Sequence, residues 1–181
     1  ACLTNGEIQD FANNLLSNLS IVCDYLTSLG VELIGNKDLI IVNGKNNYFT
    51  KKIEISTNTF PGFATDLQPI FLPLMCQRAE MGILNEIIFD SRFKHINELI
   101  KMGAKIRNKD SNKVFTKKIK SFLPSDKLIS YDIRGGASIL LAALNAKGQS
   151  KIFNFTQIQR GYDNLIPNLC NLGADIEISN E

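Results

Sequence analysis

The sequence has no tryptophan, a single histidine and only four cysteines. His95 cannot form a metal site without other ligands. The cysteines show neither CxxC nor zinc-type spacing, and each lies in an apolar stretch. We therefore predict no metal, no cofactor and buried free thiols in a reducing compartment. The cysteines are Cys2, Cys23, Cys76 and Cys170.

Long apolar runs and a strong net charge are also missing. No apolar run is long enough to cross a bilayer, and the start lacks the basic, apolar and small-residue pattern of a signal peptide. The formal net charge of +2 is too small to indicate nucleic-acid binding. These absences predict a cytoplasmic protein without membrane or nucleic-acid partners. A chain of 181 residues is long enough to bury a real core.

Arginine is scarce, because lysine outnumbers it 15 to 5. Only arginine offers a rigid fork for binding carboxylate or phosphate, so each arginine is a candidate anion ligand. We expect Arg78 and Arg107 at the surface. Arg92, Arg134 and Arg160 each lie just before or at the start of a predicted helix, where anions bind well.

Three segments of the chain resemble one another. Residues 25–33, 99–106 and 168–176 each read as a helix end, a glycine after the helix and then a strand. The repeat of about 70 residues is too long for a solenoid. It predicts three similar α/β units, at residues 1–48, 49–121 and 122–181.

The middle unit has the predicted order βαβαββ, and the other two follow part of it. Its elements are expected at 52–56, 66–80, 82–89, 95–102, 105–107 and 113–119. The third unit is expected at 127–131 (strand), 135–147 (helix), 150–155 (strand), 161–172 (helix) and 174–178 (strand). The first is expected to hold a helix end at 1–3, a strand at 6–12, a helix at 18–29 and two strands to about 43. It therefore lacks its first strand and most of its first helix.

A sheet without one of its strands exposes unpaired backbone groups along an edge. The chain also has no initiator methionine. We therefore expect the chain to be a piece of a longer protein. As a fragment, it is expected to cover the open edge by self-association.

The segment at 60–68 reads as a loop that runs into a helix. Pro61 and Gly62 break regular structure, and Thr65 with Gln68 has the pattern of a capping box. Asp66 then lies in the first helical turn. By itself, this position is most typical of a surface charge that complements the helix dipole. The alternative is a carboxylate directed at a ligand.

The helix starts of different units face one cleft if the sheets pack around a common axis. Asp66 and Asp132 would then meet the arginines at 92, 134 and 160 in an anion-binding site. The glycines at 135 and 136 favour a close backbone approach, but they do not form a known phosphate loop. A local surface ion pair between Asp132 and Arg134 remains the alternative.

Four segments carry a resemblance to a known family. Residues 60–68, 86–95, 132–138 and 160–162 resemble the UDP-N-acetylglucosamine enolpyruvyltransferases. The resemblance implies an α/β (α+β) fold, the inside-out α/β barrel domain built from repeated βαβαββ units that 5-enolpyruvylshikimate-3-phosphate synthase shares. Residues 1–181 would be an incomplete C-terminal domain with about two and a half units.

The resemblance also implies an activity. These transferases move enolpyruvate from phosphoenolpyruvate to the 3′-hydroxyl of UDP-N-acetylglucosamine, through a tetrahedral ketal, and release phosphate. This is the first committed step of peptidoglycan synthesis, so the implied roles are in cell wall biogenesis, cell shape and cell division. The implied partners are the two substrates and an N-terminal domain of the same protein.

Matching positions imply roles for individual residues. Asp66 matches the carboxylate that contacts the sugar 3′-hydroxyl and is the proposed base, and Asp132 matches an acid near the reacting carbons. The backbone of Ile88 matches a contact to the UDP-sugar. Arg92, Arg134 and Arg160 match guanidinium groups that bind the phosphoenolpyruvate anion or act in the closed state of the enzyme. The implied catalytic residues are Asp66, Asp132, Arg134 and Arg160, and the implied substrate-binding residues are Asp66, Ile88, Arg92, Arg134 and Arg160.

The chain also departs from the family pattern. Ser91 stands where asparagine is usual, Tyr131 where threonine is usual and Gln159 where aspartate is usual. The family's mobile-loop cysteine (aspartate in some members), its N-terminal lysine and another anion-binding arginine have no match here. We therefore expect the fragment alone to be inactive. The alternatives are a shikimate-3-phosphate enzyme and a non-catalytic scaffold, which would need none of the acidic and arginine residues.

Overall fold

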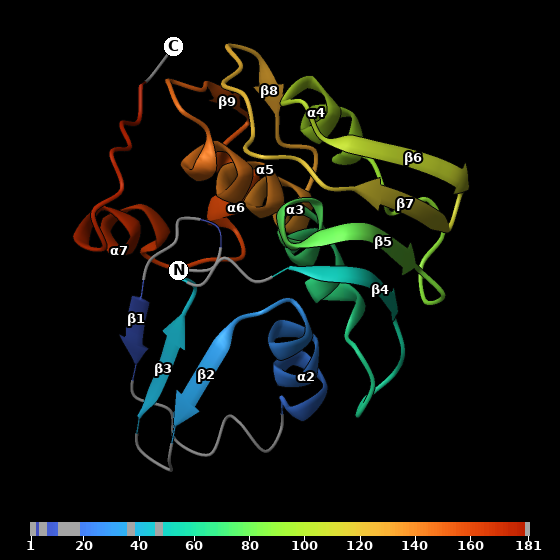
Figure 1. Cartoon of the computed structure of the whole chain (residues 1–181). Coiled ribbons are helices and arrows are strands. Elements are labelled where there is room, and N and C mark those ends of the chain that lie inside the picture. The colour runs from blue at the N-terminus through green and yellow to red at the C-terminus, as the bar shows by residue number, and fades with distance from the viewer. Residues whose placement is uncertain (1–2, 4–6, 11–18, 36–38, 46–48, 180–181) are drawn as a thin grey trace.

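The computed structural model describes residues 3, 7–10, 19–35, 39–45 and 49–179, which form a mixed α/β structure (Figure 1). The strands are β1 (Glu7–Asp10), β2 (Glu32–Gly35), β3 (Ile40–Asn43), β4 (Thr50–Ser56), β5 (Ala79–Asn85), β6 (Lys105–Asp110), β7 (Lys113–Lys117), β8 (Leu128–Ile129) and β9 (Ile152–Phe153). The helices are α2 (Ser20–Ser28), the short 3-10 helix η1 (Thr65–Leu67), α3 (Gln68–Arg78), α4 (Ile96–Lys101), α5 (Ile133–Asn145), α6 (Thr156–Gln159) and α7 (Leu165–Asn171).

The sheets repeat one arrangement of strands. The largest sheet has the order β4-β5-β7-β6, in which β4 is parallel to β5 and the other pairs are antiparallel. The sheet β1-β3-β2 copies the β5-β7-β6 part in order and direction. The pair β8-β9 is parallel, as β4-β5 is. The predicted α/β fold is therefore confirmed, with a complete βαβαββ order in the middle of the chain. The boundaries of the three units stay a prediction.

Three helices end in the same way. Gly30, Gly103 and Gly173 follow α2, α4 and α7 with φ values of 77°, 84° and 93°. In each case the residue after the glycine donates its N–H to a carbonyl five residues earlier, as in the Schellman motif. A residue with a side chain is strained at such φ values. The internal repeat seen in the sequence is therefore a repeat of helix-end geometry.

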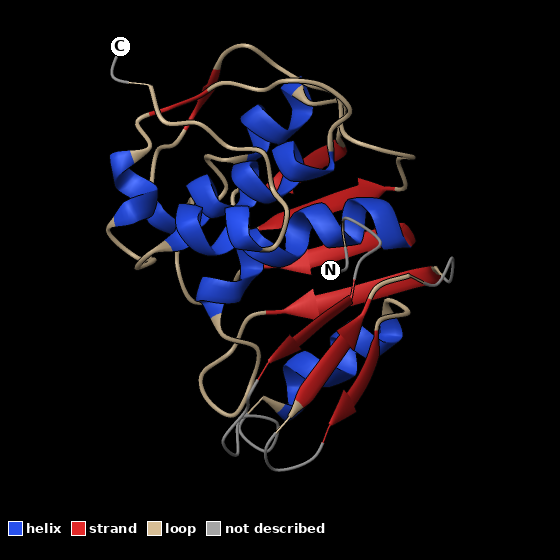
Figure 2. Ribbon diagram, turned by 90° about the vertical axis from the view of Figure 1, so that its left-hand side faces the viewer, coloured by secondary structure: helices blue, strands red, loops and turns tan. Residues whose placement is uncertain are grey.

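The helix α5 lies in the middle of the structure. It packs against α3, α4 and α6, and the strands of the largest sheet lie outside these helices (Figure 2). Its sequence is apolar or small on most sides, which fits a helix surrounded by protein. Its buried residues are Gly135, Gly136, Ala137, Ser138, Ile139, Leu140 and Ala142. The central position of α5 brings its N-terminus next to the other units.

The loop before η1 is fixed to the core by an aromatic cluster. Phe63 is 1% exposed. Its ring packs edge-to-face on Tyr25 and Phe71, with centroid distances of 5.4 and 4.9 Å. Asn58 also donates its backbone N–H to the Phe63 carbonyl. These contacts hold the chain that leads to Asp66 in one position.

Several predicted elements differ from the structure. The strand expected at 82–89 is β5, which begins at residue 79 and ends at residue 85. The helix expected at 161–172 is interrupted, because Asn164 has a left-handed backbone (φ 49°) and α7 begins only after it. Residues 174–178 are not a strand, since no neighbouring strand pairs with them in the described chain. The ends of the elements expected at 1–3, 6–12 and 18–29 lie partly outside the described residues.

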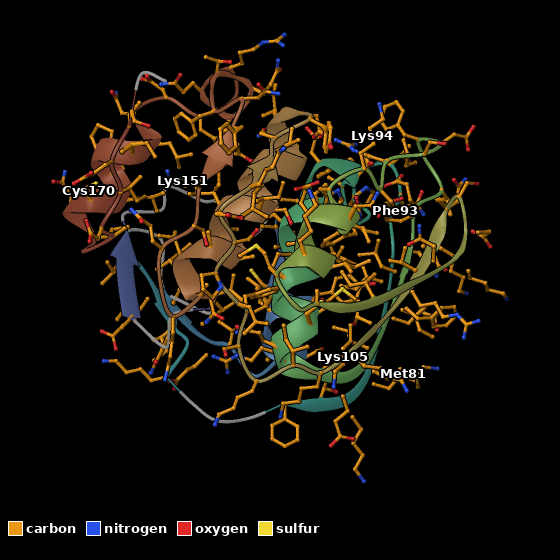
Figure 3. All side chains as sticks on the ribbon, turned by 90° about the horizontal axis from the view of Figure 1, so that it is seen from above. Met81, Phe93, Lys94, Lys105, Lys151 and Cys170 are labelled. Carbon is orange, nitrogen blue, oxygen red and sulfur yellow. The ribbon has the colours of Figure 1, made fainter. Side chains whose placement is uncertain are left out.

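Two predictions about burial are also wrong. Arg78 is 6% exposed rather than at the surface, and its guanidinium donates to the Gly44 carbonyl at 2.5 Å. Cys170 is exposed on α7 at the edge of the molecule (Figure 3), whereas Cys76 is buried and Cys23 half-buried. Burial raises the pKa of the Cys76 thiol to about 12. Cys2 lies outside the described residues.

No helix in the described part of the chain is both long enough and apolar enough to span a bilayer.

Candidate active site

Asp66 lies in η1, one turn before α3. The capping box predicted here is wrong, because neither helix start has a side-chain cap. The Thr65 hydroxyl instead donates to Glu86 at 2.8 Å and accepts from Arg92 at 2.5 Å. Gln68 is fully buried. Tertiary contacts have therefore taken over the hydroxyl that a local cap would use.

Two arginines from different parts of the chain meet at Asp66. Nη2 of Arg92 lies 2.5 Å from Asp66 Oδ1, and Nη2 of Arg134 lies 3.4 Å from Oδ2. The hydrogen bond from Arg92 lowers the pKa of Asp66 and is the largest cause. Partial burial opposes it, and the positive charges of both arginines lower the pKa further. Asp66 is therefore held as a carboxylate.

Aromatic rings lie under both guanidinium groups. Arg92 lies 5.3 Å from the ring centre of Phe89, and Arg134 lies 5.0 Å from that of Tyr162. Such stacking fixes the plane of a guanidinium without using its N–H groups. The turn that carries Arg92 is anchored by the buried Phe93, while Lys94 beside it is exposed (Figure 3).

Asp132 is the N-cap of α5. Its Oδ1 accepts from the Gly135 N–H at 2.7 Å. The local ion pair with Arg134 that the sequence left open is not formed, since Arg134 turns to Asp66. His95 lies buried nearby, and burial lowers its pKa to about 4, against the influence of Asp132. The neutral His95 therefore adds no charge to the site.

Two glycines allow the site's elements to approach closely. A Cβ on Gly136 would lie 2.2 Å from Ser130 Oγ and 2.5 Å from a side-chain carbon of Ile158. A Cβ on Gly161 would lie 2.2 Å from a methyl group of Ile133. Larger residues would push the turn at 160–162 away from the start of α5. The glycines thus serve packing, as the sequence suggested for 135–136.

These residues enclose a cavity of about 410 Å³. Its three guanidinium groups and two carboxylates leave one net positive charge, and the N-terminus of α5 adds backbone dipoles. Arg160 is exposed there and donates to Gln157 at 3.1 Å. The cavity suits a small anion with several oxygen atoms. It is lined by Asp66, Arg92, Tyr131, Asp132, Ile133, Arg134, Gln157 and Arg160.

The structure thus brings together five of the six residues singled out from the sequence. Ile88 does not line this cavity; it lies in the exposed segment after β5. Sequence reasoning missed Gln157, the stacking role of Tyr162, and Glu86 with Thr65. No local pattern indicates these contacts, because each joins residues that are far apart in the sequence or depends on side-chain direction. The catalytic and binding roles themselves remain predictions.

No group of three or more histidine, cysteine or acidic side chains is arranged to hold a metal among the described residues.

Comparison with known proteins identifies the family. Residues 1–169 match the sequence profile of EPSP synthase (3-phosphoshikimate 1-carboxyvinyltransferase). The chain belongs to the EPSP synthase family. Within it, the chain is similar to curated enzymes named UDP-N-acetylglucosamine 1-carboxyvinyltransferase. It is 34% identical over 177 residues to the one from Geobacter metallireducens and 35% identical over 173 residues to one from Bacillus cereus. The resemblance seen in the sequence is confirmed.

The chain covers only part of these family members. The match includes 98% of this chain but 41% of the Geobacter protein, and 96% of this chain but 39% of the Bacillus protein. The structure is similar to the enolpyruvyl transferase NikO from Streptomyces tendae, with a TM-score of 0.88 at 24% identity over 98% of this chain and 41% of that one. EPSP synthase from Acinetobacter baumannii gives a TM-score of 0.52 at 13% identity, over 83% of this chain and 36% of that one. These structures support the fold.

Proposed function

We propose that the protein containing this chain transfers enolpyruvate from phosphoenolpyruvate to the 3′-hydroxyl of UDP-N-acetylglucosamine and releases phosphate. The observation that carries the proposal is the cavity where Asp66 is paired with Arg92 and Arg134 beside Arg160. Phosphoenolpyruvate carries a phosphate and a carboxylate, which are the groups that guanidinium forks bind. The names of the curated relatives support the acceptor.

In this proposal, substrate binding turns Asp66 into a base. While it is paired with Arg92 and Arg134, Asp66 is a weak base, because both arginines stabilise its charged form. The anionic groups of phosphoenolpyruvate compete with Asp66 for Arg92 and Arg134. When those contacts turn to the substrate and water leaves, the proton affinity of Asp66 rises. Asp66 can then take the proton of the 3′-hydroxyl.

The bond changes follow from this arrangement. The 3′-oxygen attacks C2 of phosphoenolpyruvate while C3 gains a proton, which gives a tetrahedral ketal. Loss of a proton from C3 then restores the double bond, and the C2–O bond to phosphate breaks. We place Asp132 near these carbons because it lines the same cavity. The arginines stabilise the charge on the leaving phosphate. We further propose that the backbone of Ile88 contacts the UDP-sugar from beside the cavity.

We propose that this chain supplies only part of the machinery. It spans about two fifths of the length of its curated relatives. The remainder would contribute further anion-binding groups, close over the cavity and pair with the outer edge of β1, where no described strand is bound. The isolated chain would have no turnover and would self-associate through that edge. The activity would be the first committed step of peptidoglycan synthesis, in the cytoplasm.

The acceptor can be tested directly. The protein at its natural length is given phosphoenolpyruvate with either UDP-N-acetylglucosamine or shikimate-3-phosphate, and phosphate release is measured. We expect turnover with the UDP-sugar only. The description of the matching family profile favours shikimate-3-phosphate as the second candidate, and turnover with it alone would replace our proposal.

Two substitutions distinguish an enzyme from a non-catalytic scaffold. Asp66→Asn and Arg134→Ala would each remove most turnover if the cavity is catalytic. Equal activity of both variants and the unaltered protein would contradict the assigned roles.

A further inference from the structure

A buried glutamate outside the cavity connects several parts of the candidate site. Glu86 follows β5 and is 0% exposed. Its Oε1 accepts from the Thr57 hydroxyl at 2.9 Å and from the backbone N–H groups of Ile88 and Phe89 at 2.9 and 3.1 Å. Its Oε2 accepts from the Thr65 hydroxyl at 2.8 Å. A buried carboxylate with four donors is fully satisfied and strongly directional.

The two oxygens of Glu86 bind two different segments of the chain, which we call its two limbs: residues 88–89 at Oε1 and Thr65 at Oε2. Oε1 fixes the segment of Ile88 and Phe89, whose ring lies under Arg92. Oε2 fixes the Thr65 hydroxyl in one orientation, because its hydrogen points at Glu86. The lone pairs of Thr65 are then free to accept from Arg92 Nη1 at 2.5 Å. The other end of the same guanidinium is bonded to Asp66.

We propose that Glu86 is a positioning residue that aligns Arg92 with Asp66 by way of Thr65, while it holds the Ile88 segment separately. Without an acceptor at Oε2, the hydrogen of the Thr65 hydroxyl no longer points at residue 86, and the hydroxyl turns away from the orientation that accepts from Arg92. Arg92 then loses one of its two side-chain hydrogen bonds and leaves Asp66 less tightly held. This inference rests on the proposed function for its kinetic consequences, but the alignment itself does not depend on the substrate.

Glu86→Gln changes the link to Thr65 but not the contacts at Oε1, and it hardly alters the shape of the side chain. The amide oxygen can keep the three donors at the Oε1 position. The amide NH₂ then faces the Thr65 hydroxyl, which must turn and accept from it. Thr65→Val removes the same link from the other side and keeps the shape of a β-branched residue. It keeps the Glu86 charge and the three donors at Oε1, although Oε2 loses its donor, so it is a second, independent variant if Glu86→Gln fails to fold.

A second buried carboxylate provides the matched control. Glu98 is 1% exposed and accepts from Lys101 and from the Ile129 N–H, and it does not line the cavity. Glu98→Gln therefore measures what loss of a buried charge does to the fold alone. Its melting temperature is compared with that of Glu86→Gln.

The kinetic test uses the protein at its natural length with UDP-N-acetylglucosamine and phosphoenolpyruvate. We expect kcat to fall about 10- to 100-fold in Glu86→Gln and Thr65→Val, because small displacements of reacting groups have effects of that size. The KM for the UDP-sugar should stay within about twofold, since the Ile88 limb is retained. The double variant should be no worse than either single one. Unchanged kcat in Thr65→Val, or additive losses, would overturn the proposal.

A measurement without substrate separates this inference from the proposed function. Carboxyl ¹³C NMR follows the titration of Asp66 in the protein at its natural length. We expect the titration to move to higher pH in Glu86→Gln and Thr65→Val, and to stay in place in Glu98→Gln. If the protein has no turnover but the titration moves, the proposed function fails and the alignment stands. If the titration stays in place in both variants, the alignment fails.

Discussion

Arg92 and Asp66 are 26 positions apart in the sequence, yet a nitrogen of one lies 2.5 Å from an oxygen of the other. Arg134 reaches the second oxygen of Asp66 from the start of α5. The proposed base is thus occupied by the groups that would bind the substrate's anion. In the proposed mechanism, substrate binding and activation of the base would be coupled, because the substrate and Asp66 would compete for the same guanidinium groups.

The pairing of Asp66 gives the fold a dependence on acidic pH. Its pKa lies below the ordinary value of 3.8, so the stabilisation is complete above that value and is lost as the pH falls through the lower, folded-state pKa. We expect Asp66→Asn to melt below the unaltered chain at pH 7, with a difference that disappears under strongly acidic conditions. Thermal melts at several pH values measure this. Asp126→Asn, at an exposed aspartate outside the cavity, controls for the loss of a negative charge. A difference that persists at the lowest pH would contradict the pairing.

His95 predicts a second, separate dependence at milder pH. Burial lowers its pKa from 6.5 to about 4, so the unfolded chain binds the proton more readily between these values. Stability should fall by at most about 1.4 kcal/mol per pH unit as the pH drops through this window. Urea unfolding at pH 7 and pH 5 gives the slope. His95→Gln should flatten it, and a slope that does not change would show that His95 is not the group responsible.

A lysine should not be able to replace the guanidinium of Arg134, which is stacked on Tyr162. Arg134→Lys keeps the charge but loses the paired N–H groups and the plane that lies over Tyr162. We expect kcat/KM for phosphoenolpyruvate to fall about 100-fold in the protein at its natural length. Arg107→Lys, at an exposed position on β6, should change it little. Equal activity of the two variants would argue against a role for the fork.

Asp132 has a structural role that can be separated from a chemical one. Asparagine caps helices about as well as aspartate, whereas alanine does not. We expect Asp132→Ala to lower the free energy of unfolding by about 1 kcal/mol, and Asp132→Asn to leave it nearly unchanged. Turnover should fall in both variants if the carboxylate acts near the reacting carbons. Full turnover in Asp132→Asn would limit Asp132 to capping.

Ser91 offers a gain in stability. Its φ of 57° lies in the left-handed region, which serine adopts at a cost and asparagine or glycine adopts more readily. Ser91→Asn should raise the free energy of unfolding by about 0.5 kcal/mol and Ser91→Gly by up to about 1 kcal/mol. Ser111→Gly is the control, because Ser111 is exposed and has no positive φ. It should be neutral or destabilising, and a similar gain there would remove the explanation from backbone strain.

The sequence predicts most where local rules act alone. Gly30, Gly103 and Gly173 end their helices as expected, because the left-handed position needs no distant partner. The capping box at Thr65 is wrong because Glu86 and Arg92 take its hydroxyl. The strand expected at 82–89 ends early because the Glu86 carboxylate takes the N–H groups of residues 88 and 89. Arg78 is buried because its guanidinium donates a hydrogen bond to the carbonyl of Gly44, which directly follows β3.

The candidate site shows the same division. The residue types at its centre follow from the motifs, and their convergence follows from the repeat. Their pairing does not, since spacing alone favours a local pair of Asp132 with Arg134, whereas the packing of α5 directs Arg134 to Asp66. Long-range side-chain pairing depends on the assembled fold, which no local pattern encodes.

The most direct test of the account is the mass of the nucleotide product. The protein at its natural length and the isolated 181-residue chain are each incubated with UDP-N-acetylglucosamine and phosphoenolpyruvate. We predict that only the natural-length protein adds an enolpyruvyl group to the nucleotide, with one phosphate released for each transfer. Product from the isolated chain, or no product from the natural-length protein, would contradict the account.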